Sequence, residues 1–563
     1  MALCGAIETT VVDSGFESQV LDYAQIFLCL CLHFDINRNA MRHWLSIVIL
    51  ALAAKFVTAP GAFAVTPQVE QWGTFEISLT GPTNGNPFVD VYLNARFYQG
   101  PVSIKVWGFY DGDGVYRIRF MPPAKGKWRY VTTSNVKELH GIEGEFEVVS
   151  PSPGNHGPVH VTNVFHFAYA DGTPFHPLGT TVYAWIHQSL ELQERTLKTL
   201  ANSPFNKLRF CVFPKWYDWN RTEPLAYPFE GTRGNFDKTR FNVKFFQLLD
   251  RRIQDLMKLG IEADVILFHP YDEGHWGFDR MTRSEDERYL RYVIARLGAF
   301  RNVWWSLANE YDFMECKSEE DWYHIGEFVS KTDPFNHLLS IHNGYKLFNH
   351  TLPWITHASI QNGAAVENPN SAVLYRDAYR KPVIYDEIKY EGNIPRRWGN
   401  LSAEELVFRF WNATIAGCYA THGETYLSPD EILWWSKGGE LKGQSPARLA
   451  FLRQVLESAP PDGIEPIDKW QNPEYGGKAP DFYLVYFGKA TPEEWEFRLP
   501  KRALESGMTF KVEILDTWNM TVTPVDDLFV VEKSGLYFFA DKDGKKVQLP
   551  GRPYIALRIT RQK

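Results

Sequence analysis

Two glutamates at the ends of apolar segments are the residues in this chain most able to do chemistry. Glu310 ends the segment 302–310 and Glu387 ends the segment 381–387, and each segment is typical of a short buried strand. Glycosidic cleavage requires an acid that protonates the leaving oxygen and a second carboxylate on the other face of the sugar. One glutamate alone would more often be an ion-pair partner at a strand end. Two of them, delivered to one end of a parallel barrel, predict Glu310 as general acid/base and Glu387 as nucleophile.

Other polar residues that follow predicted strands are candidates for binding substrate. Asn309 is placed to hydrogen-bond a sugar hydroxyl, and Glu424 is an alternative to Glu387 as the second carboxylate. Tryptophans in the loops after the predicted strands could stack on sugar rings, although about half of them are expected only to pack. The predicted substrate-binding set is Asn309, His269, Asp272, Tyr311, His342, Gln361, His422, Glu424, Trp216 and Trp434, with Trp219, Trp276 and Trp435 in similar loops.

A dense group of histidines and acids follows the third predicted strand. His269, Asp272, Glu273 and His275 could suggest a metal site. Their spacing matches no zinc motif, and three of the ligands would have to come from one loop. Hydrogen bonding to substrate or structural pairing is therefore the favoured interpretation, and we predict neither a metal nor a cofactor. The sequence also lacks a G-x-S-x-G elbow and a phosphate-binding loop, which argues against esterase and nucleotide chemistry.

The elements that must position these residues alternate between strand and helix patterns from about residue 166. The apolar face of residues 241–257, closed by Gly260, is one clear amphipathic helix. Eight strands with intervening helices predict a (β/α)₈ TIM barrel over residues 160–458. A doubly wound sheet is the alternative, but no glycine-rich phosphate loop follows the first strand. The predicted strands are 177–182, 207–213, 262–268, 303–308, 338–342, 354–360, 382–385 and 417–421.

In the segments on either side of the barrel, apolar and polar residues alternate with a period of two, as they do in strands. Residues 65–152 predict an N-terminal β-sandwich domain, and residues 462–563 predict a C-terminal β-sandwich domain. The Asp-Gly-Asp-Gly run at 111–114 is favoured as a turn, with a calcium loop as the alternative. The sequence therefore predicts a multidomain protein, a TIM barrel flanked by two β-sandwich domains.

The first 64 residues predict a targeting region. Residues 41–64 combine a basic start at Met41, a short apolar run and the small-residue site Ala62-Phe63-Ala64, as in a secretory signal peptide. Residues 1–40 are predicted to be a dispensable extension or the product of an upstream start codon. No membrane span is predicted after cleavage. These features predict a secreted or periplasmic protein, and the fold type favours a bacterial source.

Composition limits the class of partner. The chain has 563 residues, a formal net charge of -8 and an aromatic fraction of 15%. An acidic protein with a pI near 6.1 is not expected to bind nucleic acid. Three isolated cysteines follow residue 64 and build no disulfide framework, so the fold must rest on its apolar cores. We predict a carbohydrate as the partner, and the sequence leaves the oligomeric state open.

Several motifs resemble a known family. Residues 109–122 with 126–130 are similar to an N-terminal domain of unknown function numbered 5060, and the C-terminal segment resembles a domain numbered 5605. Segments 268–272, 304–312, 385–387, 390–392 and 421–425 resemble the glycosidase barrels of the 4038 type, and the two glutamates resemble those of the clan A glycoside hydrolases. The resemblance implies a carbohydrate-active enzyme and carries the clan's roles to Glu310 and Glu387 only.

The resulting hypothesis is a secreted retaining glycoside hydrolase that cleaves a polysaccharide or oligosaccharide by double displacement at two glutamates. A non-catalytic carbohydrate-binding protein on a barrel scaffold is an alternative. A transglycosylase is another, because it shares the covalent intermediate. The sugar, its anomeric configuration and exo or endo action are not specified by the sequence.

Overall fold

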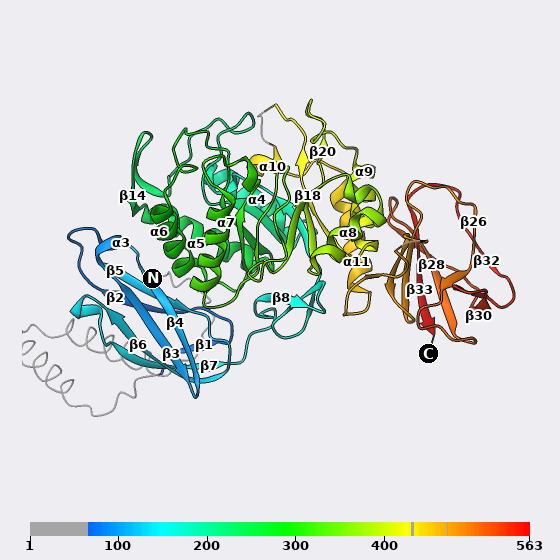
Figure 1. Cartoon of the computed structure of the whole chain (residues 1–563), viewed down its shortest axis with the longest axis horizontal. Coiled ribbons are helices and arrows are strands. Elements are labelled where there is room, and N and C mark those ends of the chain that lie inside the picture. The colour runs from blue at the N-terminus through cyan, green and yellow to red at the C-terminus, as the bar shows by residue number, and fades with distance from the viewer. Residues whose placement is uncertain (1–65, 430–432, 470, 563) are drawn as a thin grey trace, which may run out of the picture. The chain divides into compact units, whose positions relative to one another are not determined.

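The computed structural model describes residues 66–429, 433–469 and 471–562. The predicted extension 1–40 and signal peptide 41–64 lie outside these residues. From the N-terminus the described chain contains a β-rich domain, a parallel barrel and a second β-rich domain (Figure 1). Within these segments no helix is long and apolar enough to cross a membrane.

Eight parallel strands form the barrel. They pair in the order β17-β16-β15-β12-β11-β21-β19-β18. A single parallel bridge between His342 and Ser359 joins the two ends of this order, so the barrel is nearly closed. Every predicted strand overlaps one of these, which confirms the barrel. Their bounds are β11 Leu178–Thr181, β12 Lys207–Cys211, β15 Glu262–Phe268, β16 Val303–Ala308, β17 Leu339–Ser340, β18 Ala358–Gln361, β19 Val383–Glu387 and β21 Tyr419–His422.

Two strands are shorter than predicted. β17 is only two residues long, and β18 begins at Ala358. The segments before and beside them are joined at Thr356, whose backbone nitrogen donates to the carbonyl of Leu339 at 2.9 Å. The Thr356 hydroxyl adds to this contact, at 2.8 Å from the backbone nitrogen of Leu339 and 3.0 Å from its carbonyl oxygen.

Helices cover the barrel, and side chains fix where several of them begin. Asn242 caps α5, and Thr282 with Glu285 forms a capping box at the start of α6. The predicted helix over residues 241–257 is α5, shifted by one or two residues. The helix bounds are α4 Leu190–Ala201, α5 Val243–Lys258, α6 Arg283–Leu297, α7 Glu319–Thr332, α8 Pro369–Tyr379, α9 Ala403–Ile415, α10 Trp434–Lys437 and α11 Ser445–Glu457.

A small antiparallel sheet packs at the N-terminal end of the barrel. It consists of β8 Val159–Thr162, β9 His166–Tyr169 and β10 Pro174–Phe175. Phe167 and Phe175 share a buried cluster with Trp304, near the start of β16, and with residues near the starts of other barrel strands. The cluster plugs this end, so the opposite end, where the strands finish, is free to hold a site.

The N-terminal domain is β-rich, as predicted. Its seven strands pair in the order β1-β7-β6-β3-β4-β5-β2. The rings of Phe75 on β2 and Phe146 on β7 stack at 3.8 Å, although their strands lie far apart in this order. The sheet therefore curls around its own core. The strand bounds are β1 Gln68–Glu70, β2 Phe75–Thr80, β3 Leu93–Gln99, β4 Val102–Tyr110, β5 Val115–Phe120, β6 Gly126–Ser134 and β7 Glu143–Val149.

The Asp-Gly-Asp-Gly run is the turn between β4 and β5. The backbone nitrogen of Asp111 donates to the carbonyl of Val115, and its carboxylate pairs with Arg117 at 2.5 Å and with Arg296 of α6 at 2.9 Å. Arg296 also pairs with Asp250 of α5 at 2.7 Å. The turn thus joins the N-terminal domain to two barrel helices through buried ion pairs.

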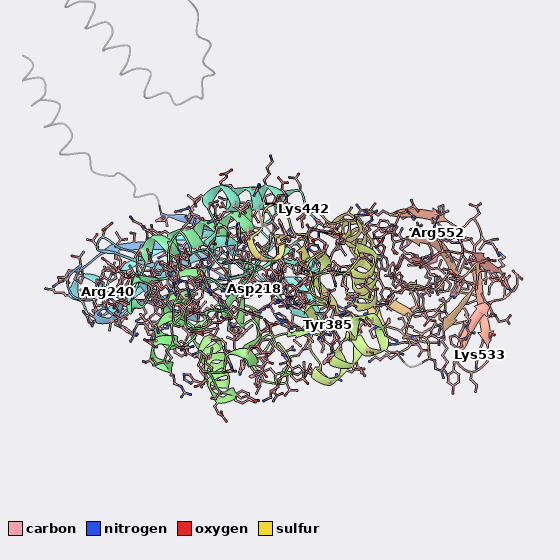
Figure 2. The ribbon with its side chains drawn as sticks, turned by 90° about the horizontal axis from the view of Figure 1, so that it is seen from above. Asp218, Arg240, Tyr385, Lys442, Lys533 and Arg552 are labelled. Atoms are coloured by element: carbon pink, nitrogen blue, oxygen red, sulfur yellow. The ribbon has the colours of Figure 1, made fainter. Side chains whose placement is uncertain are left out.

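The C-terminal domain is also β-rich. It has a hydrophobic core of its own, and some of its strands also contribute to a hydrophobic core that includes barrel residues. Phe482 and Leu484 of β25 pack in one buried cluster with Phe410 and Trp411 of α9. Lys533, on β30, and Arg552 belong to this domain, and Tyr385 marks the barrel (Figure 2). The main strands are β23 Glu465–Pro466, β24 Tyr475–Lys478, β25 Phe482–Tyr486, β27 Arg498–Pro500, β28 Thr509–Asp516, β30 Phe529–Ser534, β31 Phe538–Asp541 and β33 Ile555–Gln562.

Candidate active site

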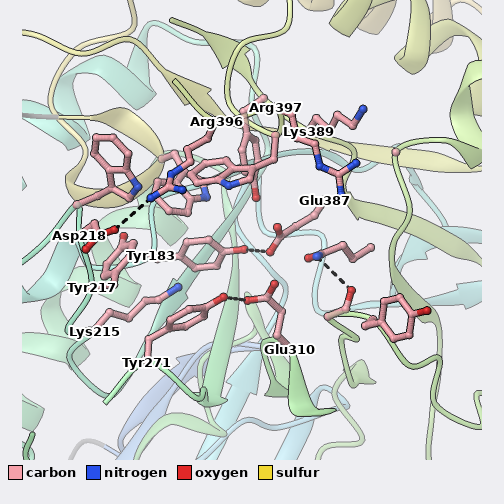
Figure 3. Close-up of a pocket in the computed structure, with 18 of the residues that line it drawn as sticks. Tyr183, Lys215, Tyr217, Asp218, Tyr271, Glu310, Glu387, Lys389, Arg396 and Arg397 are labelled. Atoms are coloured by element: carbon pink, nitrogen blue, oxygen red, sulfur yellow. Dashed lines mark hydrogen bonds and ion pairs between the residues drawn. The ribbon is translucent and has the colours of Figure 1, made fainter. Parts of the chain in front are cut away.

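A cavity of about 770 Å³ opens at the C-terminal ends of the barrel strands. Both predicted catalytic glutamates, Glu310 and Glu387, line it (Figure 3). Its walls combine aromatic rings, among them Tyr217, Trp398 and Trp435, with several cationic side chains. Such a cavity suits a ligand that has both apolar ring faces and many hydroxyl groups.

Glu310 follows β16 and is held in an unusual backbone conformation. Its φ is 50° and its ψ is 54°, the left-handed region that non-glycine residues rarely adopt. The backbone on both sides is tied down, because Asn309 donates to the carbonyl of Phe268 and Tyr311 to that of His342, both at 3.0 Å. Strain of this kind persists only where surrounding bonds impose it and is concentrated at functional sites.

Two side chains hold the carboxyl group of Glu310. The hydroxyl of Tyr271 donates to Oε2, and Nδ2 of Asn309 donates to the same oxygen at 3.0 Å. Asn309 is fully buried and its Oδ1 lies 3.0 Å from the hydroxyl of Tyr183. The structure thus places Asn309 between the two catalytic candidates, where it orients Glu310.

Glu387 ends β19 and faces the same space. It accepts a hydrogen bond from the Tyr183 hydroxyl, and Nε2 of His342 lies 3.5 Å from its Oε1. Tyr183 has one proton for two acceptors, Glu387 and Asn309, so it can donate to only one of them at a time. Figure 3 shows Tyr183 and Tyr271 pointing their hydroxyls at Glu387 and Glu310 respectively.

The two glutamates are separated electrostatically. Burial raises the pKa of Glu310 to about 7, and the charge of Glu387 adds to the rise. Burial acts upward on the pKa of Glu387 too, but hydrogen bonding and charge from His342, with the Tyr183 hydroxyl and Arg209, lower it to about 2. Below about pH 7 Glu310 is therefore mostly protonated while Glu387 is ionised, which is the division of roles that a general acid and a nucleophile require.

Hydrogen bonds fix the orientation of the His342 ring. Ser359 donates its hydroxyl proton to Asp386 at 2.5 Å, so its oxygen faces Nδ1 of His342 at 2.9 Å as an acceptor. Gln361 donates its amide to the carbonyl of Gly344, which turns its Oε1 toward Nε2 of His342 at 3.4 Å. Together these contacts hold Nε2 toward Glu387.

A buried charge network supports this arrangement from beneath. Lys207 bridges Asp264 at 2.7 Å and Asp386 at 2.9 Å, and Thr421 donates to Asp386 at 2.7 Å. Burial alone would raise the pKa of Asp386, but Arg209 and Lys207 hold it well below its ordinary value. Asp386 therefore stays ionised and accepts from Ser359, which keeps His342 directed at Glu387.

Some of the other predicted binding residues lie at the cavity wall. Gln361 and Trp219 line the cavity, and His342 contacts Glu387 from just behind it. Trp435 also lines it, whereas its neighbour Trp434 is buried and donates its ring N–H to Thr180 at 2.8 Å. Trp216 stacks on the ring of His275 at 3.7 Å, outside the lining.

The loop after β15 also differs from its predicted role. Nε2 of His269 bonds the carbonyl of Phe213 at 3.0 Å, and its Nδ1 accepts from the backbone of Tyr271 at 3.1 Å. Asp272 accepts four backbone N–H groups from residues 276–279. The hydrogen-bonding atoms of both side chains therefore hold the loop that carries Tyr271 in its conformation. Tyr311 is likewise outside the lining and packs edge-on against Phe348 at 5.0 Å.

His422 and Glu424 lie behind the cavity wall. With Glu391 they form a group whose ligand atoms lie within 4.8 Å of one another, found in a search of the described residues for metal-binding sets. Glu391 already accepts four hydrogen bonds, from Tyr426, Gln444 and twice from Ser445, which occupies its oxygen lone pairs. Glu424 accepts the backbone N–H groups of residues 442 and 443. The two acids therefore fix the turn that leads into α11.

Sequence reasoning missed the residues that hold the glutamates. Tyr183 and Tyr271 each come two or three residues after a barrel strand, as Glu310 does, so the rule of reading strand ends could have found them. Lys215, in the loop after β12, also lines the cavity. Nothing in its sequence context separates it from an ordinary surface lysine.

Comparison with known proteins agrees with this geometry. The sequence model of a family described as "Apiosidase-like, catalytic domain" matches residues 162–471. The chain belongs to the apiosidase-like family. Models of two domains of unknown function, 5060 and 5605, match residues 68–135 and 470–560 of this apiosidase-like protein. No curated protein matches.

Solved structures point the same way. A candidate glycoside hydrolase from Bacteroides vulgatus is 44% identical, with a TM-score of 0.86, and the match covers 88% of this chain and 100% of that one. A family 5 glycoside hydrolase from the same organism is 15% identical, with a TM-score of 0.52 over 73% of this chain and 94% of its own, which shows a shared fold. Together with the catalytic-domain match, these findings support a glycosidase.

Proposed function

We propose that the chain is a retaining glycosidase in which Glu310 is the general acid/base and Glu387 is the nucleophile. The observation that carries the proposal is the pair itself: two buried carboxyls face one cavity, and their pKa values are shifted in opposite directions, to about 7 and about 2. Identical residues with different protonation states are what double displacement needs.

The proposed reaction has two steps. In the first, Glu387 attacks the anomeric carbon while Glu310 gives its proton to the leaving oxygen, which forms a glycosyl-enzyme ester. In the second, Glu310 takes a proton from water, the water oxygen attacks the anomeric carbon, and the ester bond to Glu387 breaks. Tyr183, Asn309 and His342 hold the two carboxyl groups in place during both steps.

The description of the family suggests the first substrate to test. An apiosidase would release apiose, a branched pentose, from a polysaccharide or oligosaccharide, and we propose an apioside or a related pentoside as the substrate. The cavity volume and its aromatic walls support a sugar ligand. We also infer secretion through residues 41–64, and β-sandwich domains at 65–152 and 462–563 around a barrel at 160–458. The family matches over 68–135, 162–471 and 470–560 support these limits.

The test is a kinetic screen of the purified protein on aryl glycosides, led by an aryl apioside, with Glu310→Gln and Glu387→Gln as variants. Glu424→Gln is the matched control, because it alters a buried glutamate outside the cavity lining. We expect wild-type turnover with retention of configuration, at least a thousandfold loss in the two catalytic variants, and near wild-type rates in the control.

A second measurement locates the nucleophile. A 2-deoxy-2-fluoro glycoside slows hydrolysis of the ester and should label the peptide that contains Glu387, as seen by mass spectrometry. Labelling elsewhere, or wild-type rates in Glu387→Gln, would overturn the assignment. Sugar binding without turnover would favour the non-catalytic alternative, and transfer of sugar to added acceptors would favour a transglycosylase.

A further inference from the structure

Lys215 carries a buried ammonium group into the catalytic cavity. The residue is only 1% exposed, yet it is part of the lining. Its Nζ lies 3.8 Å from the ring centroid of Tyr183 and 4.1 Å from that of Tyr271. Among the residues that the structure describes, no carboxylate oxygen lies within the 4.0 Å ion-pair distance of this nitrogen. A buried cation without its own counter-ion is unusual and calls for a role.

The two rings that hold Lys215 belong to the tyrosines that hold the catalytic glutamates. Tyr183 contacts Glu387 through its hydroxyl, and Tyr271 contacts Glu310 in the same way. Figure 3 shows the Lys215 side chain reaching between the rings of Tyr183 and Tyr271, whose hydroxyls point on toward Glu387 and Glu310. Ring faces hold an ammonium without neutralising it, which a carboxylate partner would do. Burial lowers the pKa of Lys215, and the charges of Cys211, Glu310 and Glu387 oppose that effect. The two carboxyl groups thus favour the ammonium form of Lys215, whose charge acts on the site in return.

The reaction proposed above moves one negative charge between the two glutamates. In the free enzyme Glu387 is ionised and Glu310 is protonated. In the glycosyl-enzyme, Glu387 is a neutral ester and Glu310, having given its proton to the leaving group, is the carboxylate. Hydrolysis of the ester returns the charge to Glu387. The site thus holds a single negative charge throughout, at one position or the other.

We propose that Lys215 is a positioning residue that balances this charge at both of its positions. The inference rests on the double displacement proposed above. The ammonium lies against the tyrosine partner of each glutamate, so it favours the carboxylate form of either one without binding to it directly. The other titratable or charged groups that face Lys215 are Tyr217, whose ring centroid lies 4.9 Å from Nζ, with the Cys211 thiol, Arg209 and His269. Arg209 is the one that also acts on Glu387.

The proposal makes the alkaline limb of the pH–rate profile depend on Lys215. That limb reports loss of the proton from Glu310 in the free enzyme. Removing a nearby cation makes ionisation of Glu310 harder, so the limb should move to higher pH by about 1–3 units. A residue that only packs between the tyrosines would lower the rate without moving the limb.

The experiment compares Lys215→Met, Lys215→Gln and Lys215→Arg with the wild-type enzyme, as kcat/KM on an aryl glycoside across the pH range. Lys105→Met is the matched control, because Lys105 lies over the ring of Trp107 at 4.4 Å in the N-terminal domain. We expect kcat/KM to fall about a hundredfold in the Met and Gln variants, with the alkaline limb moved upward. The Arg variant should keep the limb in place, and the control should match wild type.

The results separate this proposal from the one on which it rests. An active wild-type enzyme whose Lys215→Met and Lys215→Gln variants lose rate with an unmoved limb overturns the role of Lys215 alone. A Lys215→Arg variant as impaired as Lys215→Met overturns it too, provided thermal unfolding shows both to be folded. Silence of the wild-type enzyme on every glycoside overturns the double displacement and the role of Lys215 together.

Discussion

Replacing the two proposed catalytic glutamates, Glu310 and Glu387, with glutamine should change the stability of the protein in opposite directions. Glutamine resembles a protonated carboxyl group in shape and carries no charge. In the wild-type protein the Tyr271 and Asn309 bonds both go to Oε2 of Glu310. The amide oxygen of a glutamine can accept both of them, so Glu310→Gln keeps the contacts and removes only the ability to ionise.

The sign follows from which state binds protons more tightly. The pKa of Glu310 is raised from 4.5 to about 7 in the folded protein. The folded state therefore binds that proton more tightly, and the wild-type protein loses stability as the pH rises from about 4.5 to 7. Glu310→Gln has no carboxyl proton to release, so its stability does not fall over this pH range. The pKa of Glu387 is lowered to about 2. The ionised Glu387 therefore stabilises the folded protein above about pH 4.5, and this stabilisation is lost as the pH falls toward 2. Glu387→Gln lacks it at every pH.

Each shift is worth roughly 3 kcal/mol, since one pKa unit corresponds to about 1.4 kcal/mol. At pH 8 we expect Glu310→Gln to be more stable than wild type by about 3 kcal/mol and Glu387→Gln to be less stable by a similar amount. At pH 4 the gain in Glu310→Gln should vanish. Calorimetry of the barrel transition at both pH values measures the difference, with Glu424→Gln as a second test of a glutamate whose pKa burial raises to about 7.

A gain in Glu310→Gln that is the same at pH 4 and pH 8 would refute this reasoning. Such a result would mean that relief of packing or backbone strain, rather than ionisation, sets its stability. Equal signs for the two variants at pH 8 would also refute it, because the opposite shifts are the basis of the proposed roles.

Three further changes test the supporting residues. Tyr271→Phe removes a hydrogen bond that lowers the pKa of Glu310, so kcat/KM should fall about tenfold and the alkaline limb should move upward; an unchanged profile would contradict this. Asp386→Asn leaves buried cations short of a partner and should destabilise the fold by about 3–5 kcal/mol in chemical unfolding, whereas a loss below about 1 kcal/mol would count against the network. Trp435→Ala should raise KM about tenfold while Trp216→Ala leaves KM near wild type, because Trp435 lines the cavity and Trp216 does not. Equal effects of the two changes on KM would contradict this.

The barrel could be predicted from sequence because its strands are buried on both faces. Segments such as residues 303–308 are almost continuously apolar and buried, and this one is bounded by Asn302 and Asn309. The rule that barrel enzymes work at strand ends then picked out Glu310 and Glu387 without further information. Strand lengths were harder to predict, since β17 is only two residues long within the predicted strand 338–342.

The same rule selected too many residues, and the reason is local. His269 and Asp272 follow β15 as Glu310 follows β16, but their polar atoms are taken by backbone groups of neighbouring loops. A sequence shows that a polar residue stands at a strand end. It does not show whether the surrounding loops use that residue before a ligand can. Glu424 was selected for the same reason, and its carboxylate accepts two backbone N–H groups. His422 is buried, and its Nδ1 contacts the Thr180 hydroxyl.

Nothing in either glutamate itself decides which one keeps its proton. Glu310 is held by Tyr271 and Asn309, and Glu387 faces Nε2 of His342. The orientation of that ring depends in turn on Ser359 and Asp386, which lie on two different strands. The difference in pKa is therefore a property of strand register. A shift of one residue in β18 or β19 would separate Ser359 from the ring or from Asp386 and leave Glu387 without its oriented histidine. The division of labour between two identical residues is thus set by the barrel as a whole.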